Sequence, residues 1–192
     1  MYNIFAIATA YLLGSFPSAY VIGRILKRID IRETGSGNVG GMNIYRAAGF
    51  LPGILTVLLD IGKGVLAVLL AVNWSEEPLV VFMAGLLVVL GHNYSVFLRF
   101  KGGKGLATGL GVFIALSPIT IPFLLLAALC LTIVLRDTNT AFGASTLSIP
   151  LILYFQYQEA AWVLFSLAFA VIILTKHIQD FQAYRKGRRK II

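Results

Sequence analysis

The chain of 192 residues is 58% hydrophobic and only 12% charged, with a mean hydropathy of +0.87 and a formal net charge of +8 at pH 7. This composition excludes a soluble globular domain and is typical of an integral membrane protein. The one cysteine, Cys130, lies inside an apolar run, which excludes a disulfide framework or a cysteine metal site.

Three apolar runs are long enough to cross a bilayer as helices. An α-helix needs about 20 apolar residues to span the roughly 30 Å hydrocarbon core, and residues 4–25, 51–73 and 79–98 meet that length. The first run has no charge before Arg24 and no small-residue cleavage site. We therefore expect it to be a permanent span and not a signal peptide.

The next uncharged run, residues 105–135, is long for one helix and short for two. Its SPITIP segment, residues 117–122, holds two prolines that break a helix near the middle of the run, so two short spans fit. Residues 141–157 and 160–176 form the remaining apolar runs. The hydropathy pattern alone allows six or seven spans.

Charge asymmetry decides between six and seven. Seven spans place all the basic loops on one face and the acidic loops on the other, and the positive-inside rule makes the basic face cytoplasmic. The basic segments are residues 24–46, 99–104, 136 and 185–192, and the acidic loops are residues 73–78 and 156–160. We expect one all-α, multi-pass membrane domain over residues 1–192 with about seven transmembrane helices, the N-terminus outside, and a basic cytoplasmic tail at residues 185–192.

Two glycine-rich segments, residues 33–49 and 91–109, both lie at the cytoplasmic boundary of these spans. Glycines let the backbone approach a ligand and direct successive N–H groups at an anion, and the second segment leads into a helix N-terminus, which favours negative charge. Neutral donors and cations lie among the glycines: Ser36, Asn38, Asn43, Thr108, Arg46, Lys101 and Lys104. Together the segments predict one phosphate-binding site.

A plainer interpretation exists for the same residues. Cations at a cytoplasmic helix end commonly set topology or bind lipid head groups, and glycines in membrane helices often serve close packing. The P-loop pattern fails, since Leu98 and Gly105 stand where it requires a glycine and a hydroxyl. No zinc motif, nucleophile elbow or carboxylate cluster occurs. We therefore expect no ATP, metal, cofactor or nucleic acid.

The glycine-rich segments carry a family resemblance. GSGNVGGMNIYR, residues 35–46, resembles the first signature of the acyl-phosphate-dependent, PlsY-type glycerol-3-phosphate acyltransferases, approximately G-S-G-N-x-G-x-x-N-x-x-R. GHNYSVFLRFKGGKGLAT, residues 91–108, resembles the second signature. Further similarity lies in YLLGSFPSAY, residues 11–20, and in DIGKG, residues 60–64.

The chain departs from the family pattern at two places. Ser95 stands where the family usually has proline. The third signature, roughly H-x-x-N-I-x-R-L-x-x-G, is kept only as His177, as Asp180 in the asparagine position, and as Gly187.

The resemblance implies a bacterial inner-membrane enzyme whose active site faces the cytoplasm. Such an enzyme transfers a fatty acyl group from acyl phosphate to the 1-hydroxyl of glycerol 3-phosphate, giving lysophosphatidate and phosphate in phospholipid biosynthesis. Both substrates carry phosphate and one carries an acyl chain, so a site of cations beside an apolar groove suits them. Because acyl phosphate is already activated, we expect direct transfer without an acyl-enzyme. The expected partners are these substrates and the lipid bilayer, and no protein partner is indicated.

Site roles follow from this hypothesis. Ser36, Asn38 and the neighbouring glycine amides, with Arg46 and Lys104, are expected to bind a phosphate and stabilise the leaving charge. Lys101 and His177 are expected to meet the second phosphate. The catalytic set is then Ser36, Arg46, Lys104 and His177, and the substrate-binding set is Gly37, Asn38, Gly40, Asn43, His92, Lys101, Gly102, Gly103 and Thr108. The base stays open between His92, His177 and a substrate phosphate oxygen.

Two questions stay open at this level. Asp60 and Lys63 form an ionisable pair inside an apolar span, which is either support for the pocket or a purely structural ion pair. The alternative function is a transporter or channel for a phosphorylated solute, which glycine-rich broken helices also suit. The short chain, the lack of an evident inverted repeat and the one-sided cations favour the enzyme.

Overall fold

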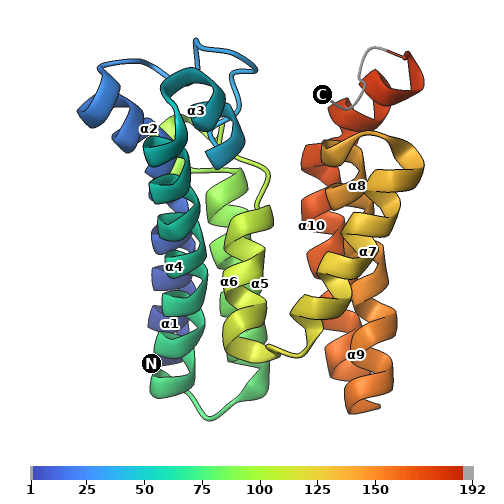
Figure 1. The fold of residues 1–192 in the computed structure, drawn as a ribbon. Helices are drawn as coiled ribbons and strands as arrows, with labels where there is room; N and C mark the ends of the chain where they lie inside the picture. The colour runs from blue at the N-terminus through green and yellow to red at the C-terminus, as the bar shows by residue number, and fades with distance from the viewer. Residues whose placement is uncertain (1, 188–192) are drawn as a thin grey trace. The chain divides into compact units, whose positions relative to one another are not determined.

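The structure is a computed structural model that describes residues 2–187, and the part it describes is helical with no strand. The chain forms two compact units, Met1–Leu116 and Ser117–Ile192. The first contains α1 (Tyr2–Ser15), α2 (Ser18–Ile22), the π-helical turn η1 (Gly23–Lys27), α3 (Gly41–Ala48), α4 (Phe50–Trp74), α5 (Pro78–Asn93), the 3-10 turn η2 (Val96–Leu98) and α6 (Leu106–Leu116). The second contains α7 (Thr120–Leu135), α8 (Thr138–Ser145), η3 (Thr146–Ser148), α9 (Ile149–Tyr157) and α10 (Ala160–Arg185) (Figure 1).

Four of the described helical stretches are long and apolar enough to cross a membrane. They are Tyr2–Lys27, Phe50–Trp74, Pro78–Leu98 and Ala160–Arg185, and Leu106–Leu116 and Thr120–Leu135 are shorter apolar helices. Large apolar side chains on these helices, such as Leu58, Leu69 and Leu164, are exposed, as expected for surfaces that face lipid. The expected all-α membrane class is confirmed. Seven spans and the orientation of the termini stay predictions.

The predicted break inside residues 105–135 is present, because α6 ends at Leu116 and α7 begins at Thr120. Side chains satisfy polar groups at the start of the second unit. The hydroxyls of Ser117 and Thr120 lie 2.8 Å apart, and Ser117 also donates to Gln156 Oε1 at 3.2 Å. These bonds pair the polar side chains at the break, which would be costly to leave unpaired in an apolar environment.

Three other boundaries differ from the expectation. The first span is broken after Ser15, because Pro17 lacks the N–H that would continue the helix. Residues 141–157 form two α-helices joined by η3, and Pro150 lies in the first turn of the second. The last helix continues beyond residue 176 as far as Arg185, because neither proline nor glycine occurs between residue 176 and Gly187.

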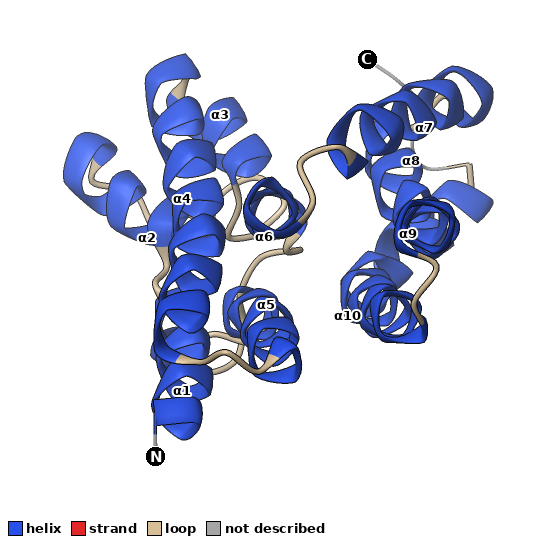
Figure 2. Ribbon diagram, turned by 90° about the horizontal axis from the view of Figure 1, so that it is seen from below, coloured by secondary structure: helices blue, strands red, loops and turns tan. Residues whose placement is uncertain are grey.

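Glycines let the helices of the first unit approach closely. α1 packs against α5, and α4 packs against α6 (Figure 2). The α-carbon of Gly91 faces the carbonyl oxygen of Tyr11, and that of Gly64 faces the carbonyl oxygen of Thr108, at separations that leave no room for a Cβ atom. Backbone-to-backbone packing of this kind associates membrane helices by dispersion forces and needs small residues.

The two glycine-rich segments lie at the same end of the first unit. α2 and α3 lie at its upper end in Figure 1, where α5 gives way to the loop that leads to α6. The opposite end holds the start of α1 and the α4–α5 connection, where Asn3 Nδ2 donates to Glu77 Oε1 at 3.1 Å. The expected juxtaposition of the two segments is therefore confirmed.

The packing of α4 on α6 gives a paired test. Gly64→Ala places a methyl group against Thr108 O, so the helices must separate, and we expect a loss of about 1–3 kcal/mol in the free energy of unfolding. Gly62→Ala, two residues away, is the matched control, because nothing described except adjacent backbone of its own helix lies within 4 Å of the added atom. It should keep or raise stability. Thermal unfolding in detergent measures both variants, and equal destabilisation would contradict this packing.

Candidate functional site

The first glycine-rich segment is held in shape by one buried side chain. Asn43, in α3, is 5% exposed, and its Nδ2 donates to the carbonyl oxygens of Ile31 at 3.2 Å, Thr34 at 3.0 Å and Asn38 at 3.0 Å. Its Oδ1 accepts the N–H of Ser36 at 3.0 Å. The Asn43 amide therefore braces the loop, and its direct contact with a substrate stays a prediction.

The groups expected to bind phosphate lie on the outside of this braced loop. Gly35 and Gly37 adopt the left-handed region, with φ of +61° and +70°, and turn the backbone around Ser36. The Ser36 side chain is exposed, and its Oγ accepts the Asn38 N–H at 3.4 Å. Arg46 is exposed in the last turn of α3, after Gly40 has started that helix in an extended conformation.

An ion cluster fixes the start of the same loop. Arg32 donates to both carboxylate oxygens of Asp30, at 2.9 Å and 2.6 Å, and Arg24 donates to Oδ2 at 2.6 Å. Both guanidinium groups lie over the Tyr20 ring, 4.8 Å and 5.3 Å from its centroid.

Hydrogen bonds from Arg32 favour the charged carboxylate and hold the pKa of Asp30 below its ordinary value. The stability that Asp30 contributes is thus present above the ordinary pKa of an aspartate and is lost only as the pH falls through the lowered value. The bonds from Arg32 to Asp30 therefore hold the start of the loop at neutral pH.

The second glycine-rich segment folds back on the end of α5. The N–H of Gly102 donates to Asn93 O at 3.2 Å, and that of Gly103 donates to His92 O at 3.0 Å. A Cβ atom at Gly103 would collide with the His92 ring and with Val39 O of the first segment. The two segments are thus in contact, and a residue without a side chain is what allows the contact.

The turn before Gly102 is tightly wound and presents the cations. Arg99 and Phe100 both have positive φ, +52° and +62°, which is rare for residues other than glycine. The Phe100 N–H donates to Ser95 O at 2.8 Å, which helps to hold this strained turn. Lys101 is exposed and Lys104 is half-buried on either side of the glycine pair.

Ser95 stands where the resembled signature has proline, and its backbone has a conformation that proline could adopt. Its φ is −63°, which is the value that proline imposes. The Ser95 hydroxyl adds a contact that proline lacks, because it donates to Ser15 O at 2.5 Å. This bond joins the end of α5 to the break between α1 and α2.

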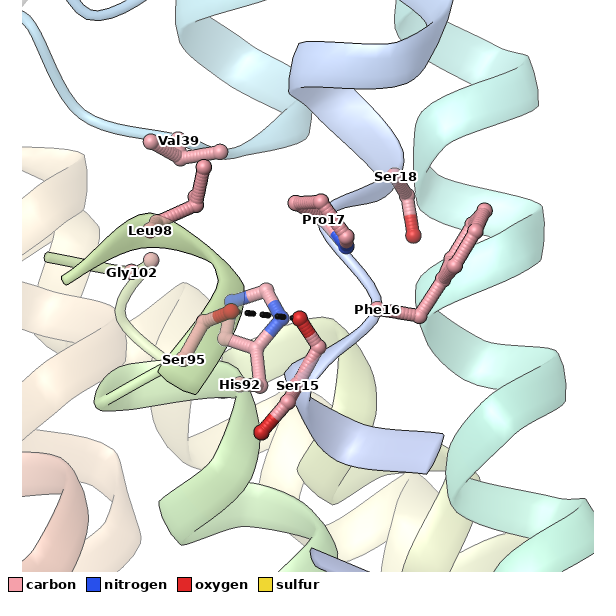
Figure 3. A pocket seen from close by; sticks show the side chains of 10 residues that line it. Ser15, Phe16, Pro17, Ser18, Val39, His92, Ser95, Leu98 and Gly102 are labelled. Atoms are coloured by element: carbon pink, nitrogen blue, oxygen red, sulfur yellow. Dashed lines mark hydrogen bonds between the residues drawn. The ribbon is translucent and has the colours of Figure 1, made fainter. Parts of the chain in front are cut away.

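A small pocket lies where this break meets the glycine pair (Figure 3). It is lined by Ser15, Phe16, Pro17, Ser18, Val39, His92, Ser95, Leu98, Gly102 and Gly103. The prediction from sequence included His92 and the glycines but missed the α1–α2 break. The signal that would have found it is Pro17 flanked by serines inside an apolar run.

Asp60 and Lys63 lie buried against the same pocket. Asp60 Oδ1 is 2.9 Å from Lys63 Nζ and accepts the Ser18 hydroxyl at 2.8 Å. His92 Nδ1 lies 3.5 Å from the same oxygen, and Lys63 Nζ donates to Phe16 O at 3.0 Å. The pair is therefore part of a cluster that includes pocket residues.

The remaining predicted residues do not line the pocket. Thr108 is buried where α6 packs on α4, and none of the described residues bonds to its hydroxyl. His177 and Asp180 lie buried on α10 in the second unit, where His177 Nδ1 is 2.9 Å from Ile173 O and its ring packs on Gly143. A catalytic role for His177 stays a prediction.

Two further expectations concern metals and the tail. Across residues 2–187, no three His, Cys, Asp or Glu residues are grouped so that they could hold a metal ion. Residues 188–192 of the predicted basic tail lie outside the described part of the chain.

Comparison with known proteins gives consistent results. Residues 4–187 match the family model described as glycerol-3-phosphate acyltransferase. Glycerol-3-phosphate acyltransferase 2 of Dehalococcoides mccartyi is 43% identical over 176 residues, which cover 91% of this chain and 83% of that protein. Glycerol-3-phosphate acyltransferase of Geotalea daltonii is 37% identical over 189 residues, covering 98% and 97%.

Crystal structures also match over nearly the whole chain. PlsY, an integral membrane glycerol 3-phosphate acyltransferase, in its glycerol 3-phosphate form has a TM-score of 0.90 at 35% identity, covering 99% of this chain and 95% of that one. Its lysophosphatidic acid form has a TM-score of 0.89 at 34% identity with the same coverage.

The brace at Asn43 predicts the effect of a near-isosteric change. Asn43→Asp keeps the acceptor for Ser36 but turns an amide that donates to three carbonyl groups into a carboxylate that repels them. We expect the free energy of unfolding to fall by about 1–3 kcal/mol. We also expect faster hydrogen exchange of the backbone amides of residues 31–38, measured by mass spectrometry. Met42→Gln, at the exposed neighbour, should leave exchange unchanged. Unaltered exchange in Asn43→Asp would contradict the brace.

Proposed function

The chain belongs to the PlsY-type family of glycerol-3-phosphate acyltransferases, and from this premise we propose that it uses acyl phosphate as its acyl donor. The chain is a membrane glycerol-3-phosphate acyltransferase. The 1-hydroxyl oxygen of glycerol 3-phosphate forms the new ester bond to the acyl carbon, and the bond from that carbon to the phosphate oxygen breaks. Lysophosphatidate and inorganic phosphate are the products. The two PlsY structures, in glycerol 3-phosphate and lysophosphatidic acid forms, support this substrate and this product.

The observation that carries the proposal is the contact between the two glycine-rich segments at Gly103 and Val39. The contact gathers the exposed Ser36 hydroxyl, Arg46 and Lys101 with Lys104 at one end of the unit. Two phosphorylated substrates require several positive groups at a water boundary, and backbone N–H groups beside them add neutral donors. In the transition state the same groups stabilise the negative charge that collects on the departing phosphate.

Direct transfer without an acyl-enzyme fits the bonding of two serines of the pocket, Ser95 and Ser18. Ser95 donates its hydroxyl hydrogen to Ser15 O, and Ser18 donates to Asp60 Oδ1. Neither of these bonds pairs the hydroxyl with a histidine that could activate it. Because the acyl phosphate is already a reactive mixed anhydride, holding it in line with the glycerol hydroxyl is sufficient.

A substrate phosphate oxygen is the base that we favour for the hydroxyl proton. His92 is 7% exposed, with Nδ1 facing Asp60 and Nε2 facing the α-carbon of Gly103. A general base needs a ring nitrogen within hydrogen-bond reach of the substrate hydroxyl, and both nitrogens of His92 face protein. His177 stays a second candidate for contact with phosphate.

We place the active site on the cytoplasmic face of a bacterial inner membrane. The end of the first unit that carries the glycine-rich segments also carries exposed Arg24, Lys27, Arg28 and Arg32. Such a one-sided excess of lysine and arginine is typical of cytoplasmic loops. This supports an orientation with the α1 N-terminus outside.

Purified protein incubated with acyl phosphate and radiolabelled glycerol 3-phosphate tests the proposal. We expect labelled lysophosphatidate and an equal amount of released phosphate. Ser36→Ala and Lys104→Ala should each lower kcat/KM on the order of 10- to 1000-fold, since each removes a group that stabilises the departing phosphate. Lys27→Ala, which removes an exposed cation outside the glycine-rich segments, is the matched control and should retain activity.

Three outcomes would contradict parts of this account. Uptake of label into sealed vesicles without product would favour a transporter. Product made equally fast from acyl-CoA would contradict the proposal that acyl phosphate is the acyl donor. Acyl label that stays on the denatured protein after incubation without glycerol 3-phosphate would contradict direct transfer.

A further inference from the structure

One carboxylate oxygen joins three helices beneath the pocket. Asp60 Oδ1, on α4, lies 2.9 Å from Lys63 Nζ of the same helix, 2.8 Å from Ser18 Oγ of α2 and 3.5 Å from His92 Nδ1 of α5. Asp60 is 2% exposed and Lys63 is 7% exposed. Ionised groups are costly in a membrane helix and mark functional positions more often than structural ones. We therefore ask what this cluster contributes to the site.

The first connection to the site runs through His92. Its carbonyl oxygen accepts the Gly103 N–H at 3.0 Å, and its ring packs so closely on the α-carbon of Gly103 that a Cβ atom would overlap Nε2. The direction of the ring thus fixes the position of Gly103. Lys104 is the next residue in the chain, so it moves with that turn.

The second connection runs to the break between α1 and α2. Pro17 removes a backbone donor there, and two side chains satisfy the carbonyl groups before it. Lys63 Nζ donates to Phe16 O at 3.0 Å, and Ser95 Oγ donates to Ser15 O at 2.5 Å. Figure 3 shows this break facing His92 and Ser95 across the pocket. The cluster therefore fixes both walls of the pocket.

We propose that Asp60 is a positioning residue of the acyltransferase, which holds the His92 ring by accepting Nδ1–H and so places the turn from Gly102 to Lys104. Asp60 does not touch substrate in this role, because it acts through His92. The inference rests on the proposed function, in which Lys104 binds phosphate. The competing explanation is an Asp60–Lys63 ion pair that only stabilises the fold, and it predicts no energetic link between Asp60 and His92 in catalysis.

A double-mutant cycle separates these explanations. Asp60→Asn weakens the hold on the ring by removing the charge of the acceptor, and His92→Gln removes the ring. Each should lower kcat/KM on the order of 10-fold. If Asp60 acts through His92, the double variant should be about as slow as either single variant. Multiplied effects, on the order of 100-fold, would overturn the proposal.

Thr56→Val is the matched control for burial and polarity. Thr56 is buried in α4 one turn before Asp60, and its hydroxyl donates to Pro52 O at 2.9 Å, away from the pocket. This variant should lower the thermal unfolding temperature and leave kcat/KM of the folded fraction unchanged. A loss of kcat/KM in Thr56→Val equal to that in Asp60→Asn would overturn the specific role of Asp60.

A spectroscopic measurement on the unchanged chain does not depend on how the variants fold. The chain has two histidines, so 15N NMR of histidine-labelled protein, compared with His177→Gln, assigns the His92 ring. The proposal requires a proton on Nδ1 of His92. A spectrum with Nδ1 unprotonated would overturn it. Absence of acyl-phosphate-dependent product from the unchanged chain would instead count against the proposed function.

Discussion

The structure depends on a close approach of backbone at Gly103. There the loop before α6 touches both the end of α5, at His92, and the first glycine-rich loop, at Val39. A side chain of any size would separate these segments, and with them Arg46 and Lys104, the cations that we propose to act at a common site. The same means of contact, glycine against backbone, joins α1 to α5 and α4 to α6. The scaffold and the site therefore rely on one packing principle.

The polar groups of the first unit divide into those that hold the backbone and those that remain at the surface. Asn43, Asp30 and Asp60 are buried, and the hydrogen bonds and ion pairs described above join them to other protein groups. Ser36 and Arg46 are exposed on the loop and helix that these residues support. Preorganised donors of this kind lose little energy to reorganisation when charge develops in a transition state. A rigid loop backed by buried polar groups is thus the physical basis for the proposed catalysis.

Much of this arrangement could be predicted from the sequence. Hydropathy identified the membrane class, the two prolines of residues 117–122 identified the break between α6 and α7, and the glycine-rich signatures identified both segments and their family. The partner of Asp60 was harder to foresee, because His92 lies on another helix and only packing brings it within 3.5 Å. The brace at Asn43 was likewise hidden, since its spacing from residues 31–38 matches no helix or strand period. Pro17 signalled the α1–α2 break, but hydropathy averaged over the run concealed it.

The central claim is that both glycine-rich segments bind one phosphate. Solid-state NMR that recouples 31P of acyl phosphate, bound in the absence of glycerol 3-phosphate, with 15N of the protein tests this claim directly. The account predicts phosphorus contacts in the same sample to the backbone nitrogens around Ser36 and to Nζ of Lys104. Contacts to one segment alone, with the other unaffected by the ligand, would contradict it.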